Sequence, residues 1–192
     1  MNPIRSIALF GFLSLWRGIA LPTSARTPQV FIAQVSAEDF FNRGLEKFDA
    51  GDLEGAIADF NEAIRLEPNR LEIYLYRGMS LENSGDFQGA LADYTEAIRL
   101  APNFAVIYLS RGNIRDNLGD IEGAIADYTE AIRLNPNFAP AYNNRGITRW
   151  NSGDKSGGQS DLQQAANLFE QQGNEDGVQG VINTSERLQQ LD

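Results

Sequence analysis

Small and apolar residues recur along most of the chain in blocks that repeat every 34 positions. The stretches 51–69, 85–103 and 119–137 read GDLEGAIADFNEAIRLEPN, GDFQGALADYTEAIRLAPN and GDIEGAIADYTEAIRLNPN. Within each block the alanines and the aromatic residue are three and four positions apart, the spacing of one face of an α-helix. A fixed period of this length predicts stacked helical units, each burying its apolar face against the next.

Counting from residue 37 divides the chain into units at 37–70, 71–104, 105–138 and 139–172, followed by a tail at 173–192. Each unit starts with an expected helix, at 37–50, 71–84, 105–118 and 139–152, that ends at a Gly-Asp pair. Glycine can close one helix in the left-handed conformation, and aspartate can cap the next. The second helix is expected to stop near a proline, at Pro68, Pro102 and Pro136.

The fourth unit departs from this pattern, because Gly157 and Gly158 should weaken its second helix and Glu170 replaces the proline. The tail at 173–192 carries an apolar face, so we expect a helix that caps the stack and shields its end from water.

Glycines on the first helices and small residues on the second recur where two helices must approach closely. The first set is Gly44, Gly78, Gly112 and Gly146; the second is Ala56, Ala90, Ala124 and Gly158, followed four positions later by Phe60, Tyr94 and Tyr128 in three units. Since positions three and four apart share a helix face, these sites should form the contact within each unit.

With an aromatic residue also at Phe40, Tyr74, Tyr108 and Tyr142, these units resemble tetratricopeptide repeats over about 70% of the chain. The resemblance implies an all-α fold, a right-handed superhelix (solenoid) of about four repeats plus a C-terminal capping helix. It also implies a concave groove lined by the first helices, where partners usually dock.

By that resemblance the candidate partner-binding residues are Phe41, Leu75, Met79, Asn83, Leu109, Asn113, Asn117, Asn143, Ile147, Trp150 and Asn151, with Glu82 and Asp116 among other groove positions. Asn83, Asn117 and Asn151 form a row with the 34-residue period. Side-chain amides both donate and accept hydrogen bonds, so such a row can bond the backbone of an extended peptide. The alternative is that the row only hydrates an open groove.

Arginines stand where the family usually has leucine, at Arg43, Arg77, Arg111 and Arg145, and each has an acid at Asp59, Asp93, Asp127 or Asp161. We expect these residues to form structural ion pairs. The groove positions that grip a C-terminal carboxylate in one subclass of the family hold no Lys or Arg here, which disfavours that mode. Arg115 and Arg149 lie near the groove positions, so binding of an anion there is still an option.

Charge and composition limit the partners and the chemical activities that the chain can have. Residues 1–37 contain three arginines and no acid, whereas the remaining 155 residues hold 26 acids and 13 bases, a net charge of −13. Such a surface repels nucleic acid; it suits solubility or a basic partner. The chain has no Cys and no His, so thiolate metal sites are excluded and the commonest general base is absent. We expect no enzymatic activity, cofactor or metal.

Residues 1–36 lie outside the repeats and read as a targeting segment, expected to be cleaved or disordered. Arg5 precedes the apolar run Ile7–Trp16, and small residues follow, as in an export signal. We therefore expect an exported protein, in the periplasm, a thylakoid lumen or the medium. An organelle transit peptide and an uncleaved membrane anchor are the alternatives.

The function predicted is a protein–protein interaction scaffold that binds a peptide or protein segment in the groove, as an adapter or assembly factor for exported or membrane complexes. The alternatives are a self-associating structural subunit, hence a homo-oligomer, and an accessory subunit whose only membrane contact is an uncleaved N-terminal segment.

Overall fold

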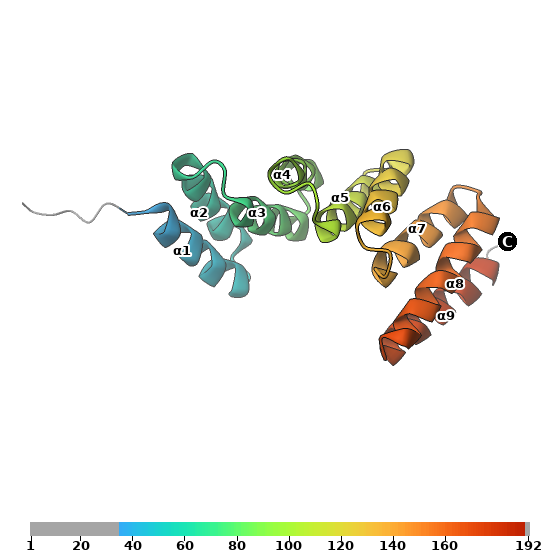
Figure 1. The fold of residues 1–192 in the computed structure, drawn as a ribbon. Helices are drawn as coiled ribbons and strands as arrows, with labels where there is room; N and C mark the ends of the chain where they lie inside the picture. The colour runs from blue at the N-terminus through green and yellow to red at the C-terminus, as the bar shows by residue number, and fades with distance from the viewer. Residues whose placement is uncertain (1–34, 191–192) are drawn as a thin grey trace, which may run out of the picture. The chain divides into compact units, whose positions relative to one another are not determined.

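The computed structural model describes residues 35–190, which contain nine α-helices and no strand (Figure 1). The helices are α1 Ala37–Asp49, α2 Leu53–Leu66, α3 Leu71–Ser84, α4 Phe87–Leu100, α5 Ala105–Asn117, α6 Ile121–Leu134, α7 Ala139–Asn151, α8 Lys155–Gln171 and α9 Glu175–Gln190. Each helix packs on the helices before and after it in the chain. The described residues thus form an all-α superhelix of helix pairs, which confirms the predicted fold class.

The targeting segment predicted at residues 1–36 lies outside the described residues, except for Val35 and Ser36. Ser36 belongs to the fold, because its hydroxyl accepts the Asp39 backbone N–H while the Asp39 carboxylate accepts the Ser36 N–H. This reciprocal capping box starts α1.

The turns between paired helices follow the Gly-Asp pattern. Gly119 has a φ of 80°, a left-handed conformation that costs glycine little, and it ends the turn after α5. Asp120 then caps α6 by accepting the Gly123 N–H at 3.0 Å. Helices α2, α4 and α6 end two residues before a proline. The predicted first helices are confirmed to within one residue.

Contacts within the units follow the predicted glycine–aromatic pairs. A Cβ atom added to Gly112 would lie 2.6 Å from Cε1 of Tyr128, and one added to Gly44 would lie 2.5 Å from Cε1 of Phe60. The Tyr128 ring is 1% exposed. The absence of a side chain at Gly112 therefore sets how closely α5 and α6 approach.

The predicted ion pairs form within each unit and join its two helices. Arg111 donates from Nε and Nη2 to the two carboxylate oxygens of Asp127 at 2.9 and 2.7 Å, and the other three pairs have the same two-pronged geometry. All four aspartates are buried. Arg115 and Arg149 contact Asp127 and Asp161 at 3.0 and 2.9 Å. They are engaged inside the units, which removes the argument for anion contacts there.

The second helix of the fourth unit forms despite its two glycines. Helix α8 runs through Gly157 and Gly158 and, at 17 residues, is three residues longer than α6. A Cβ atom on Gly158 would lie 2.7 Å from the backbone oxygen of Gly146, so glycine is required for the close approach of α7 and α8. Without a proline after it, α8 continues to Gln171.

Helix α9 packs on α8 at the end of the stack. Val181 and Leu188 are buried with Leu162 and Ala165 of α8 in one apolar cluster. Ile147 and Trp150 of α7 pack against the same cluster. Helix α9 thus covers an apolar surface that the fourth unit would otherwise expose.

Candidate binding groove

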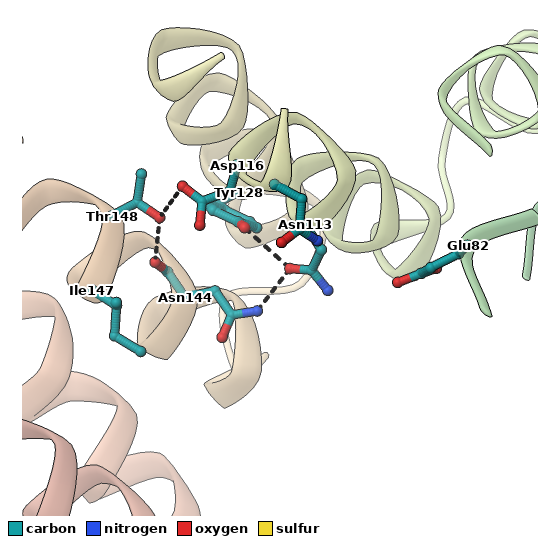
Figure 2. A pocket seen from close by; sticks show the side chains of 8 residues that line it. Glu82, Asn113, Asp116, Tyr128, Asn144, Ile147 and Thr148 are labelled. Atoms are coloured by element: carbon teal, nitrogen blue, oxygen red, sulfur yellow. Dashed lines mark hydrogen bonds between the residues drawn. The ribbon is translucent and has the colours of Figure 1, made fainter. Parts of the chain in front are cut away.

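Side chains from three successive first helices surround a polar cavity of about 330 Å³. Helix α3 contributes Glu82, α5 contributes Asn113, Asp116 and Asn117, and α7 contributes Asn144, Ile147 and Thr148; Tyr128 of α6 completes the lining (Figure 2). The cavity therefore lies on the helix face where the resemblance predicts a groove.

A hydrogen-bond network at the cavity fixes the amide of Asn113. Its Oδ1 accepts from the Tyr128 hydroxyl at 3.0 Å and from Nδ2 of Asn144 at 2.8 Å (Figure 2). Nδ2 of Asn143 in turn donates to Oδ1 of Asn144 at 3.0 Å. With two donors on its oxygen, the Asn113 side chain has one favoured orientation, and its NH₂ group has no acceptor among the described residues.

A second set of bonds joins α7 to α5. The Thr148 hydroxyl lies 2.9 Å from the backbone oxygen of Asn144 and 3.2 Å from Oδ1 of Asp116. Thr148 is buried, so this contact forms the floor of the cavity. The network and this contact together hold the two helices in register across a unit boundary.

Two buried tyrosines reach the groove face from the second helices. Burial raises the pKa of Tyr128, and the negative charge of Asp116 raises it further. Burial likewise raises the pKa of Tyr94, whose hydroxyl donates to Oε2 of Glu82 at 2.8 Å. Both hydroxyls therefore stay protonated at neutral pH and act as hydrogen-bond donors at the groove.

The structure brings only some of the sequence-predicted residues to this cavity. Asn113, Asn117 and Ile147 line it, and Asn143 adjoins it through its bond to Asn144. The other candidates on these helices lie outside the lining: Leu75 and Leu109 are partly buried, and Met79, Asn83 and Asn151 are exposed. The side-chain amides of Asn83, Asn117 and Asn151 have no hydrogen-bond partner among residues 35–190 and so remain open to a ligand or to water.

Two predicted groove residues belong instead to the apolar cores. Phe41 is 7% exposed and packs against Phe60 and Tyr76, with ring centroids 5.9 and 5.7 Å apart. Trp150 is partly buried against the cluster formed by α8 and α9. The packing of Trp150 in this terminal core accounts for a large apolar side chain at this position, so the residue gives no separate support for a groove contact.

Sequence reasoning missed Asn144, Thr148 and the hydroxyl of Tyr128. Asn144 and Thr148 occupy places in the repeat that the usual groove positions leave out. One signal in the sequence could have indicated Thr148. This polar residue stands where the preceding unit has the apolar Ile114, and both positions are buried.

Neither a metal centre nor a membrane span is visible in the part of the chain that the structure describes. No group of three or more acidic side chains there is arranged to hold a metal ion. No helix within residues 35–190 is both long and apolar enough to cross a bilayer.

Comparison with known proteins identifies the repeat. Two family models match, one described as TPR repeat at residues 112–153 and one as tetratricopeptide repeat at residues 41–103. No curated protein sequence matches the chain.

Many solved structures share the fold. MamA 41-end from Desulfovibrio magneticus RS-1 has a TM-score of 0.67 at 20% identity, covering 81% of this chain and 94% of that one. YrrB, described as a TPR protein with an unusual peptide-binding site, has a TM-score of 0.61 at 17% identity, covering 80% and 87%. The TPR2B domain of yeast Sti1, in a complex with pHsp70, has a TM-score of 0.61 at 24% identity, covering 64% and 98%. At these identities the similarity shows the fold alone.

Proposed function

The chain belongs to the tetratricopeptide repeat family, and on this basis we propose that it is a non-enzymatic scaffold that binds an extended segment of a protein partner. The segment would lie across α3, α5 and α7, over the cavity lined by Asn113 and Asn144. Two proteins of the same fold, YrrB and the Sti1 domain, are described with a peptide-binding site or a bound partner, which supports this class of function.

The observation that carries the proposal is the fixed amide of Asn113. An extended peptide presents backbone C=O and N–H groups in alternation, and the free NH₂ group of Asn113 can donate to a carbonyl. The side chain is already held by Tyr128 and Asn144, so little conformational entropy is lost when it binds. Backbone recognition of this kind would not depend on the sequence of the segment.

We expect Asn113→Ala to weaken peptide binding about three- to tenfold, the cost of one hydrogen bond. Peptides would first be selected from a random displayed library with the full chain, and one of them measured by titration calorimetry. Asn42→Ala is the matched control, because Asn42 is exposed on α1 and away from the cavity; it should bind as the wild type does.

Thermal unfolding of both variants separates a loss of binding from a loss of fold. Equal affinity of Asn113→Ala and the wild type would contradict the role of the amide. Failure to select any peptide would contradict the scaffold function itself.

We further propose that the protein acts after export, as an adapter or assembly factor for exported or membrane complexes. The support is the basic, acid-free segment before residue 37 with its apolar run Ile7–Trp16. N-terminal sequencing of the protein recovered from fractionated cells tests this, because a full-length chain in the cytosol would contradict export.

A further inference from the structure

Building on the proposed function, we propose that the cavity between α3, α5 and α7 selects a Lys or Arg side chain of the bound peptide, attracted by the negative charges of Glu82 and Asp116. The partner would then be recognised in two ways, through its backbone by amides and through one basic residue by this cavity.

Glu82 and Asp116 differ from the other carboxylates that the repeats bury. Asp59, Asp93, Asp127 and Asp161 each have an arginine partner within their own unit. Neither Glu82 nor Asp116 has a cationic partner within residues 35–190, although both are partly buried. They accept hydrogen bonds only from the hydroxyls of Tyr94 and Thr148, so their charges are solvated but not neutralised.

Each of the two carboxylates keeps one oxygen free for a ligand. Tyr94 bonds Oε2 of Glu82, and Thr148 bonds Oδ1 of Asp116. Oε1 of Glu82 and Oδ2 of Asp116 have no partner in the described part of the chain. The two carboxylates come from different units and line the same cavity, with Asn113 between them in Figure 2. The cavity therefore presents two unpaired carboxylate oxygens to an ammonium or guanidinium group.

The remaining lining suits a long basic side chain. Asn113, Asn117 and Asn144 are neutral, and no residue of the lining is Lys or Arg. Ile147 supplies an apolar wall for the methylene stem of such a side chain. Arg115, on the same helix turn as Asp116, is paired with Asp127 at 3.0 Å, so it does not compete for the site.

Charge on a larger scale favours the same ligand. Residues 38–192 carry a net charge of −13, which attracts basic segments and raises their rate of association. The effect of Asp116 on the neighbouring Tyr128, whose pKa it helps to raise, is consistent with a negative potential at the cavity floor.

The test is a double-mutant cycle with the full chain. Peptides selected from a random displayed library should be enriched in Lys or Arg, and one would be compared with the same peptide carrying Gln in place of the basic residue. Glu82→Gln with Asp116→Asn removes both charges and preserves the side-chain shapes and the oxygens that accept from Tyr94 and Thr148. This double variant should bind the basic peptide at least about tenfold more weakly and the Gln peptide nearly as the wild type does.

The control double variant is Glu54→Gln with Glu122→Gln, which makes the same change in net charge at exposed positions of α2 and α6. It should bind both peptides within about twofold of the wild type, because exposed charges at a distance are screened by salt.

Selected peptides without basic residues would overturn the charge selectivity and leave peptide binding intact. So would an equal loss of affinity for the basic and the Gln peptide in the cavity variant. If no peptide is selected at all, both this proposal and the scaffold function fail.

Discussion

At the scale of single residues, the packing of a unit and the chemistry of the groove depend on the same side chain. The Tyr128 ring crosses α5 beside Gly112, while its hydroxyl donates to Asn113 at 3.0 Å. A shift of the ring to make room for a larger residue would therefore also move the donor that orients the Asn113 amide. Stability and binding are coupled at this position.

We predict that Gly112→Ala lowers the free energy of unfolding by about 1–3 kcal/mol, since the added methyl group overpacks against Tyr128. Gly180→Ala is the matched control: a Cβ atom there has no neighbour within 4 Å, so removal of a helical glycine should stabilise by about 0.5–1 kcal/mol. Urea unfolding followed by circular dichroism measures both. Equal effects of the two substitutions would show that ring packing at Gly112 is not the cause.

Residue pairs within one unit could be predicted from the sequence, and pairs across units could not. Arg111 and Asp127 recur with the same spacing in every unit, so their pairing follows from the pattern. Asn113 meets Asn144 across 31 residues, and that contact depends on how one unit is placed on the next. The pattern inside a unit holds no information on that placement.

At the scale of elements, α9 completes the core of the fourth unit. Leu162 stands there in place of the aromatic residue of the first three units, and it is buried against Val181 and Leu188 of α9. The apolar face of α9 was predictable from the tail sequence, as was its role as a cap. The burial of Trp150 was not predictable, because an apolar residue at this helix position can equally face the groove or the core. Only the packing of α9 on α8 places Trp150 against the terminal core.

Two neighbouring residues of α9 test its role as a structural cap. Val181 is 3% exposed and Ile182 is 42% exposed. We predict that Val181→Ala lowers the free energy of unfolding by about 1–2.5 kcal/mol, whereas Ile182→Ala changes it by less than about 0.5 kcal/mol. Thermal unfolding monitored by calorimetry gives both values, and a larger effect at Ile182 would contradict the orientation of the helix.

At the scale of the whole repeat array, residues 35–190 are held mainly by contacts between helices that are neighbours in the chain. Each of the helices α2 to α8 packs on the helix before it and the helix after it, whereas α1 and α9 have such a neighbour on one side only. In such arrays stability is close to a sum of unit and interface contributions, so the ends open more easily than the middle.

We therefore expect backbone amide exchange to be slowest in α4, α5 and α6 and fastest in α1 and α9. Hydrogen–deuterium exchange followed by mass spectrometry of peptic fragments tests this directly. Uniform exchange rates from α1 to α9 would show that the array opens as one cooperative unit.

The bonds between α5 and α7 also have a mechanical consequence. Two hydrogen bonds, from Asn144 to Asn113 and from Thr148 to Asp116, cross the joint between these helices. At the joint of α3 and α5, the residues 34 positions earlier are Met79 opposite Ser110 and Glu82 opposite Ile114. Neither combination can form such a bond. One wall of the cavity is thus braced, and the wall that carries Glu82 is not. Any change in the pitch of the superhelix would alter the width of the cavity at Glu82 first, so a bound peptide that contacts both α3 and α5 would brace the joint that the fold leaves without such bonds.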